Sequence, residues 1–256
     1  MLVDTHCHIH EADFPLDPDV TIERAHAAGV SEMIVVGTSE ESSRTAVDFA
    51  ALHDGIYAAI GVHPHETHFG WNEIQDLVEA QKIVAVGEIG LDYFYNHSPR
   101  EVQIKALEEQ LQLAMNYNLP VIFHVRDKKA ERGESVWQDF WPIFDNFPGL
   151  RGELHSFTDT VTTLEEGLRR NLYIGVNGIS TFAKKDDEQA MFTAIPLDKM
   201  LLETDAPFLT PVPFRGKVNE PAFVREVAAF QAAKRQLSLD EVANQTTLNA
   251  HALFAI

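Results

Sequence analysis

The stretch Met33-Ile34-Val35-Val36 indicates the fold, because four apolar residues in succession suit a strand that is buried on both faces. Val121-Ile122-Phe123 is a second run of the same kind. Strands buried on both faces are typical of parallel sheets that helices cover on either side. We therefore predict a parallel sheet with these two runs at the centres of two of its strands.

Eight segments of this type are predicted to be strands, and helical patterns separate most of them. The predicted strands are Leu2–His8, Glu32–Gly37, Ile56–His63, Ile83–Gly90, Pro120–Val125, Leu150–His155, Leu172–Val176 and Met200–Asp205. The predicted helices are Asp19–Ala28, Ser39–His53, Pro99–Asn118, Val136–Phe147, Thr162–Arg170, Glu220–Arg235 and Ser238–Phe254, with a short one near Asp186–Ala194. Ser238 and Glu241 have the spacing of a capping box, which predicts the start of the last helix.

This alternation of strands and helices in 256 residues indicates an α/β fold, the (β/α)8 TIM barrel. A doubly wound open sheet is the alternative fold. The seventh strand and the helix near Asp186–Ala194 have the weakest patterns. There is no linker, low-complexity tract or short repeat, so we expect residues 1–256 to form a single domain.

Composition limits the compartment and the partners. No window approaches the roughly 20 apolar residues that a membrane span needs, so no membrane association is expected. The N-terminus lacks the features of a signal peptide, and a lone cysteine fits a reducing compartment, so we expect a cytoplasmic protein. The net charge of −19 favours solubility and disfavours non-specific binding to nucleic acid. No feature indicates an obligate protein partner.

Asp4-Thr5-His6-Cys7-His8 places two histidines at the end of the first predicted strand. Side chains alternate between the faces of a strand, so His6 and His8 point the same way and Cys7 points away. Two imidazoles on one side of a strand end form half of a metal site. Cys7 is expected to be a small buried side chain rather than a nucleophile.

Further histidines and carboxylates stand at the ends of later predicted strands. They are His63, Glu88, His124, His155 and Asp205. The carboxyl ends of parallel barrel strands lie on one face, where active sites are built, so these side chains are expected to converge on one pocket. Taken singly, His124 and His155 could instead be hydrogen-bonded core histidines.

The residue types then suggest the chemistry. Leaving His63 aside, the other four histidines and the two carboxylates exceed what one tetrahedral ion needs, which favours two divalent ions with Glu88 as the bridge between them. Two such ions activate a water and neutralise a phosphoryl oxygen, and their charge would attract an anionic substrate to an acidic protein. Asp205 could bind one ion and accept a proton from that water. Nitrogen-rich ligation suits Zn, Mn or Fe better than Mg, although Mg stays an alternative.

At these residues the chain resembles the TatD family of metal-dependent deoxyribonucleases, within the amidohydrolase-like barrels. The similarity extends over nearly the whole chain as a series of ordered motifs. The motifs are Asp4-Thr5-His6-Cys7-His8, Gly61-Val62-His63-Pro64, Gly87-Glu88-Ile89-Gly90-Leu91-Asp92, Leu202-Glu203-Thr204-Asp205-Ala206-Pro207, Arg215-Gly216-Lys217-Val218-Asn219-Glu220-Pro221 and Leu248-Asn249-Ala250.

The resemblance implies a ligand set for each of two ions. One ion would bind His6, His8, Glu88 and Asp205, and the other would bind Glu88, His124 and His155. Asp205 would also be the general base, and His63 would lie near the substrate or cap a loop.

Other charged and imidazole side chains are assigned supporting or surface roles. Asp4, Asp92 and Glu203 are expected to orient the ligands. Arg126 and Arg215 are the best candidates for contacts with substrate phosphates, because they lie nearest the motifs. The remaining histidines are expected on the surface or in helices, and they are His10, His26, His53, His65, His68, His97 and His251.

Two segments depart from the family pattern. After the sixth strand the family usually has His-Cys-Phe-Ser-Gly, whereas this chain has His155-Ser156-Phe157-Thr158-Asp159. The segment after His124, Val125 to Gly133, is more basic and longer than the usual turn. Both follow strands, so the substrate preference could differ from that of other members.

The leading hypothesis is a two-metal hydrolase that cleaves phosphodiester bonds of DNA by a metal-activated water, as an exodeoxyribonuclease on single strands or ends. The alternative is a metal-dependent ester or amide hydrolase, such as a deacylase of aminoacylated RNA or of a small lactone, because the same water can attack a carbonyl. A third hypothesis is a metal-binding or partner-binding protein that has lost catalysis, against which the complete ligand set argues.

Overall fold

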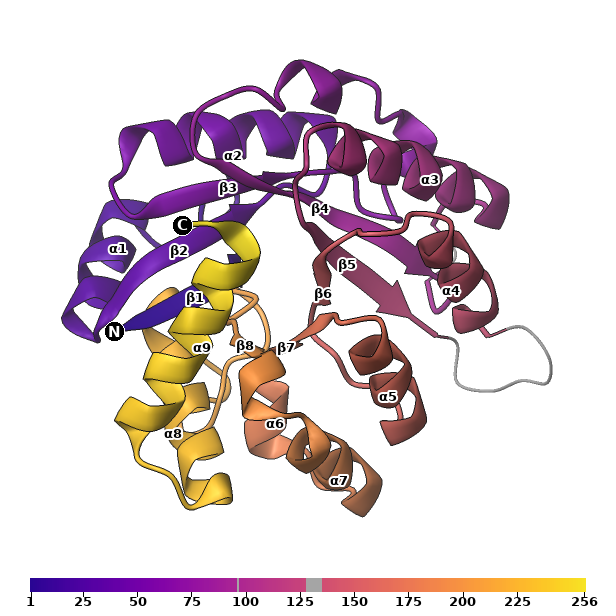
Figure 1. Cartoon of the computed structure of the whole chain (residues 1–256). Coiled ribbons are helices and arrows are strands. Elements are labelled where there is room, and N and C mark those ends of the chain that lie inside the picture. Colours follow the sequence, from indigo (N-terminus) through magenta and orange to yellow (C-terminus); the bar gives the residue numbers. More distant parts are fainter. Residues whose placement is uncertain (96, 128–134) are drawn as a thin grey trace. The chain divides into compact units, whose positions relative to one another are not determined.

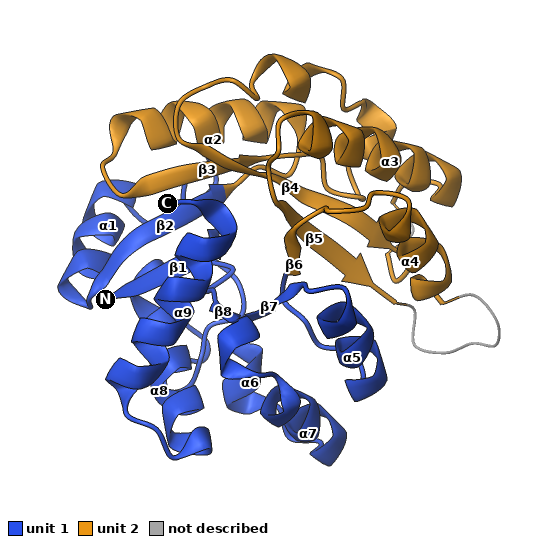
Figure 2. Ribbon diagram, in the orientation of Figure 1, with its two compact units in different colours: residues 1–35, 155–256 blue, residues 36–154 orange. Residues whose placement is uncertain are grey.

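The computed structural model describes residues 1–95, 97–127 and 135–256 of the chain. Its internal contacts form two compact units, one of residues 1–35 and 155–256 and the other of residues 36–154 (Figure 2). The first unit therefore combines both ends of the chain. The expectation that residues 1–256 form one domain stays a prediction.

The unit of residues 36–154 contains strands that pair in parallel in chain order. The strands are β3 (Ile56–Ile60), β4 (Ile83–Asp92), β5 (Val121–Arg126) and β6 (Gly152–Leu154), and the α-helices are α2 (Glu40–Leu52), α3 (Arg100–Asn116) and α4 (Trp137–Asp145). Figure 1 shows these helices along one side of the strands. Two short 3-10 helices, η1 (Thr67–Phe69) and η2 (Glu73–Asp76), follow β3 in place of an α-helix.

The other unit contains two parallel strand pairs, β1 with β2 and β7 with β8. A parallel bridge between Cys7 and Ala206 joins β1 to the segment that follows β8. The strands are β1 (Leu2–Cys7), β2 (Val30–Val36), β7 (Tyr173–Val176) and β8 (Met200–Leu202), and the helices are α1 (Pro18–Ala27), α5 (Val161–Arg169), α6 (Ile179–Phe182), α7 (Asp186–Ala194), α8 (Val224–Arg235) and α9 (Leu239–Phe254), with 3-10 helices η3 (Leu197–Lys199) and η4 (Pro221–Phe223). The predicted seventh strand and the helix over Asp186–Ala194 are both confirmed.

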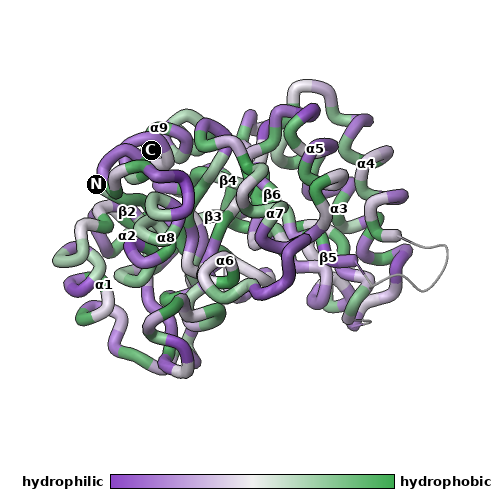
Figure 3. The backbone as a smooth tube through the Cα atoms, turned by 90° about the horizontal axis from the view of Figure 1, so that it is seen from below, coloured by the Kyte–Doolittle hydropathy of each residue, from purple (hydrophilic) through white to green (hydrophobic). Residues whose placement is uncertain are grey.

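The apolar runs lie in the strands, as predicted. All residues from Met33 to Val36 and from Val121 to Phe123 are fully buried. Phe123 packs edge-on against Phe140 of α4, with ring centroids 5.1 Å apart. Removing such a side chain from water contributes about 1.5–3 kcal/mol to folding, so these runs hold the helices against the strands. In Figure 3 strands β3 and β4 are coloured mostly as hydrophobic.

The start of α9 has the capping box that the sequence predicts. The Ser238 hydroxyl accepts a hydrogen bond from the Glu241 amide at 3.2 Å, and the Glu241 carboxylate accepts one from the Ser238 amide at 2.8 Å. Within α9, the side chain of Asn249 donates to the carbonyls of Leu197 and Met200, at 2.8 and 2.7 Å. The Leu248-Asn249-Ala250 motif therefore anchors this helix to the start of β8.

Among the described residues, the structure contains no helix with both the length and the apolar character that crossing a membrane requires.

Candidate metal centre

Three imidazoles converge on Asp205 in the first unit. The Nε2 atoms of His8, His6 and His155 lie 3.4, 3.9 and 3.9 Å from Asp205 Oδ1. The Nε2 atoms of His6 and His8 are 3.2 Å apart, and the rings of His6 and His155 stack with centroids 3.5 Å apart. The structure thus brings four of the predicted ligands together, and we call these four residues the Asp205 cluster.

Backbone hydrogen bonds position both sides of this cluster. The Asp205 amide donates to the His6 carbonyl at 2.8 Å, and the His8 amide donates to the Ala206 carbonyl at 2.8 Å. Cys7 points away from the histidines, with its thiol donating to the Ile34 carbonyl, so the predicted alternation is confirmed. Asp205 has φ of 58°, a left-handed conformation that few non-glycine residues adopt.

The Asp205 cluster suits a divalent cation. Two ligands of a tetrahedral ion with bonds of 2.0–2.1 Å lie about 3.3 to 3.4 Å apart. The separations of 3.2 Å between His6 and His8 and of 3.4 Å between His8 and Asp205 match that spacing. Burial opposes ionisation of Asp205, but the hydrogen bond from His8 and the nearby histidines outweigh it and lower its pKa. An ionised carboxylate among imidazole nitrogens is a donor set for a metal ion.

Glu203 holds His155 in place from behind. Its buried carboxylate accepts a hydrogen bond from His155 Nδ1 at 2.9 Å, and also from the Ser156 amide at 2.8 Å and the Asn177 side chain at 3.1 Å. Because Nδ1 carries the proton, the lone pair of His155 Nε2 is directed toward the Asp205 side of the ring. Glu203 therefore has the contacts expected of an orienting residue.

Asp4 connects the first strand to the segment after β8. Its carboxylate accepts hydrogen bonds from the amide and the hydroxyl of Thr204, at 2.8 and 2.5 Å, and a longer one from the His6 amide at 3.4 Å. Burial, opposed by these hydrogen bonds, raises the pKa of Asp4 to about 8. Asp4 supports the backbone on both sides of the Asp205 cluster rather than facing into it.

The unusual turn after His155 has a compact conformation. Ser156 has φ of 49°, and its amide is the one that binds Glu203. Asp159, where the family usually has glycine, accepts hydrogen bonds from the Thr160 amide at 2.6 Å and the Thr163 hydroxyl at 3.0 Å. The extra carboxylate thus belongs to the start of α5.

A second group of potential ligands lies in the unit of residues 36–154. His63, Glu88 and His124 each offer one atom within 4.8 Å of the others, and we call them the Glu88 cluster. His124 Nδ1 donates to Glu88 Oε1 at 2.7 Å, and His63 Nε2 lies 3.8 Å from the same oxygen. Pairing of β4 with β5 places Glu88 and His124 on neighbouring strands.

Asp92 holds the other side of His124. Its Oδ2 accepts hydrogen bonds from His124 Nε2 at 3.0 Å and from His65 Nε2 at 2.9 Å. Burial disfavours a charged ring, but the hydrogen bonds to Asp92 and Glu88 raise the pKa of His124 to about 9. A protonated His124 therefore supplies positive charge between the two carboxylates. Loss of the Nδ1 proton would expose a lone pair beside Glu88 while Nε2 stays bound to Asp92, as in a carboxylate–histidine–metal arrangement.

Two histidines lie elsewhere than predicted. His65 was expected on the surface, but it is partly buried and bonded to Asp92. Its spacing of two from His63 repeats that of His6 and His8, which is the signal that would have pointed to it. His10 is also buried, with 5% of its surface exposed, and its Nε2 is 3.4 Å from Glu11.

His63 caps a loop, which is one of the two roles considered for it, and its predicted position near the substrate stays a prediction. Its Nδ1 accepts a hydrogen bond from the His65 amide at 3.1 Å, which caps the start of the loop after β3. Its ring also lies in the Glu88 cluster, edge-on to His124 with centroids 4.2 Å apart. Burial, together with the neighbouring His124, lowers the pKa of His63 well below its usual value, so the ring is neutral.

The two candidate arginines are exposed and lie against aromatic rings. The Arg126 guanidinium lies 4.5 Å from the ring centroid of Phe94, and that of Arg215 lies 3.8 Å from the ring centroid of Phe182. Arg215 also donates to the Thr210 carbonyl at 2.8 Å. The predicted basic segment after His124 lies largely outside the described residues, since these omit 128–134.

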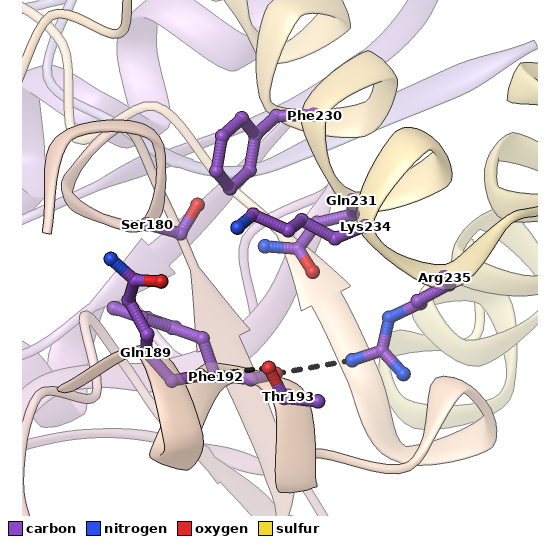
Figure 4. Close-up of a pocket in the computed structure, with 8 residues that line it drawn as sticks. All are labelled: Ser180, Gln189, Phe192, Thr193, Phe230, Gln231, Lys234 and Arg235. Atoms are coloured by element: carbon purple, nitrogen blue, oxygen red, sulfur yellow. Dashed lines mark hydrogen bonds between the residues drawn. The ribbon is translucent and has the colours of Figure 1, made fainter. Parts of the chain in front are cut away.

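A cavity in the first unit lies between α6, α7 and α8 (Figure 4). Arg235 borders it and donates to the carbonyls of Phe192 and Ile195. The side chains that line it are Ser180, Gln189, Phe192, Thr193, Phe230, Gln231, Lys234 and Arg235. They include none of the predicted ligands, so this cavity is separate from the candidate metal centre.

The chain matches known proteins over its whole length. Residues 3–255 match the family described as TatD related DNase. The chain is 37% identical over 262 residues to the uncharacterized metal-dependent hydrolase YabD of Bacillus subtilis, with all of both chains covered. It is 35% identical to the 3'-5' ssDNA/RNA exonuclease TatD of Erwinia tasmaniensis, with 99% of each chain covered.

A solved structure supports the fold. The crystal structure of YjjV, a TatD homolog from Escherichia coli, superposes with a TM-score of 0.89 at 31% identity and covers 100% of this chain and 98% of its own. The predicted (β/α)8 TIM barrel is confirmed by this similarity. With its two groups of histidines and carboxylates, the chain belongs to the TatD family of metal-dependent hydrolases.

Proposed function

We propose that the protein hydrolyses phosphodiester bonds of single-stranded nucleic acid, removing nucleotides from an end with a water that divalent metal ions activate. The observation that carries this proposal is the convergence of three imidazole nitrogens on Asp205 Oδ1. The exonuclease name of the Erwinia tasmaniensis relative supports nucleic acid as the substrate. The predicted substrate is DNA, and the same test compares it with RNA.

Each cluster would hold a divalent ion through its own side chains. His6, His8, His155 and Asp205 would be available to one ion, and Glu88 with His124 to the other. Such ions lower the pKa of a bound water and neutralise charge on a phosphoryl oxygen. The division that the resemblance implies, with Glu88 shared and His155 on the second ion, stays a prediction. Imidazole nitrogens make Zn, Mn or Fe the expected metals, with Mg as the alternative.

The chain's own groups would orient the site and move the proton. Asp205 has a lowered pKa, so it is a carboxylate at neutral pH and can accept a proton from water. Glu203 sets the tautomer of His155, and Asp92 fixes the ring of His124. Arg126 and Arg215, the two arginines proposed for phosphate contacts, are exposed and lie against aromatic rings, and a guanidinium can bind a phosphate through several N–H groups at once.

The test is hydrolysis of an end-labelled single-stranded DNA oligonucleotide, and its RNA counterpart, by chelator-stripped protein titrated with Zn, Mn or Mg. We expect stepwise, metal-dependent loss of nucleotides from one end. Asp205→Asn should abolish this activity and remain folded, whereas the matched control Asp198→Asn, at an exposed site on η3, should keep it. Full activity of Asp205→Asn would contradict the proposal.

The same experiment addresses the carbonyl alternative. If folded, metal-loaded protein degrades no oligonucleotide but hydrolyses an ester, a lactone or aminoacylated RNA, the reaction is carbonyl hydrolysis by the same clusters. The cytoplasmic location and the absence of an obligate protein partner stay predictions.

A further inference from the structure

Two large aromatic side chains are exposed directly after β4. Phe94 and Tyr95 have 44% and 40% of their surface accessible, and their ring centroids are 4.7 Å apart. The exposed His97 stacks against Tyr95 at 5.8 Å with an interplanar angle of 23°. Exposed aromatic groups that cluster in this way mark a binding surface more often than isolated ones do. We call Phe94, Tyr95 and Arg126 the aromatic platform.

Hydrogen bonds to Asp92 fix the backbone of the turn that carries the platform. Asp92 Oδ1 accepts hydrogen bonds from the amides of Phe94 and Tyr95, both at 2.9 Å, which fixes the turn that carries the two rings. Pairing of Asp92 with Arg126 brings the end of β5 beside that turn. The backbone that carries the two rings is therefore held in place before any ligand arrives, which lowers the entropy cost of binding.

The guanidinium of Arg126 completes the platform. It lies 4.5 Å from the ring centroid of Phe94 and 4.8 Å from that of Tyr95. The Arg126 side chain is exposed at the end of β5. A guanidinium beside exposed rings suits a ligand with both an aromatic face and a negative charge.

Asp92 also connects the platform to the Glu88 cluster. Its other oxygen, Oδ2, accepts hydrogen bonds from His124 and His65. The ring of His65 lies edge-on to Tyr95, with centroids 5.4 Å apart, and 6.2 Å from the ring of His124. One imidazole thus separates the platform from a candidate metal ligand, so a nucleotide stacked on the platform would have its phosphate close to that cluster.

We propose that the aromatic platform binds a nucleobase of the single-stranded substrate next to the bond that is cleaved, with Arg126 contacting the adjacent phosphate. This inference rests on the proposed function and adds a recognition element to it. A base can stack only when it is unpaired, so the platform makes the enzyme prefer single strands over duplex ends. Every base has an aromatic face, so no strong sequence preference follows.

The test uses binding and turnover with one set of variants. The substrate is a single-stranded oligonucleotide with 2-aminopurine at the end that is degraded, compared with the same strand ending in an abasic residue. Variants are Phe94→Ala, Tyr95→Ala and the ring-conserving Tyr95→Phe. The matched control is Tyr117→Ala, at the end of α3, because Tyr117 has the same exposed fraction as Phe94 (44%) and nearly that of Tyr95 (40%).

We expect Phe94→Ala and Tyr95→Ala to weaken binding and raise KM by about 5- to 150-fold, the value of one stacked base, with little change in kcat. Quenching of 2-aminopurine should fall in both variants and persist in Tyr95→Phe and Tyr117→Ala. With the abasic strand, the four variants should match the wild type. Arg126→Ala should lower the slope of log K against log salt by about 0.7, the effect of one phosphate contact on a single strand.

Failure of this inference and failure of the proposed function look different. Binding is measured on metal-free protein, so it is informative even if nothing is hydrolysed. If the wild-type protein degrades the strand, and Phe94→Ala and Tyr95→Ala bind it and quench 2-aminopurine normally, the platform is overturned but the exonuclease proposal is not. If the wild-type protein binds the strand and quenches 2-aminopurine but hydrolyses nothing, the exonuclease proposal is overturned and the platform is not. If the wild-type protein does not bind the strand, the platform is overturned.

Discussion

Replacing Glu203 with glutamine tests whether His155 is oriented for a metal ion. The carboxylate now accepts hydrogen bonds on both oxygens, from His155 Nδ1 on Oε2 and from the Ser156 amide and Asn177 on Oε1. A glutamine of the same shape has one acceptor oxygen and one NH2 group. Whichever way the amide turns, its NH2 group faces a donor.

The size of the effect follows from these contacts. If the NH2 group faces His155, the ring must shift its proton to Nε2, which removes the lone pair that points toward Asp205. If the NH2 group faces Ser156 instead, a partly buried backbone amide loses its acceptor, and the position of the side chain that supports His155 shifts. Loss of such a supporting carboxylate lowers metal affinity about 10- to 100-fold, or about 1.4–2.8 kcal/mol. A buried charge is also removed, which offsets part of the lost hydrogen bonding in the free energy of unfolding.

The assay is competition for Zn between the protein and a fluorescent chelator, with thermal unfolding of the metal-free protein measured alongside. The matched control is Glu32→Gln. Glu32 also accepts a hydrogen bond from a histidine, His251, at 2.6 Å, but lies outside both clusters. We expect the affinity of Glu203→Gln to fall 10- to 100-fold and that of Glu32→Gln to be unchanged. Folded Glu203→Gln protein with a Zn affinity within twofold of wild type would refute the reasoning.

Two further predictions concern the Glu88 cluster. Hydrogen bonds to Asp92 and Glu88 raise the pKa of His124 to about 9, so below that pH an ion that binds its Nδ1 must displace a proton. Affinity for that ion should therefore rise about tenfold per pH unit from pH 7 and level off above pH 9. Titration of the protein with metal in weak buffer measures the proton that is released on binding. Metal binding without proton release would contradict the prediction. Gly90→Ala should destabilise the fold strongly, because φ at Gly90 is 155° and a Cβ there would lie 1.8 Å from the His124 carbonyl oxygen. Gly149→Ala, with φ of 88° but nothing within 4 Å, should lose only about 1–2 kcal/mol from backbone strain; equal losses in urea unfolding would show that the contact with His124 is unimportant.

The sequence was sufficient for the features that depend on near neighbours along the chain. The runs Met33–Val36 and Val121–Phe123 are fully buried, as their continuous apolar character predicts. The Ser238 capping box and the pairing of His6 with His8 follow from fixed spacings of three and two residues. The one crossover without a predicted helix, after β3, contains only short 3-10 helices.

Tertiary structure decided which distant groups meet. Hydrogen bonds join Glu203 to His155, 48 residues apart, and Asp92 to His65, 27 residues apart. No local sequence pattern predicts such a pairing. The aromatic platform depends in the same way on Asp92, whose two oxygens bind the turn and the histidines separately. Burial of an ionisable group is tolerated only where partners satisfy it. Those partners lie on other strands or in the segments that follow them. The sequence therefore determined which strand ends hold the histidines and carboxylates, and packing of the strands determined the tautomer, charge and orientation of each group.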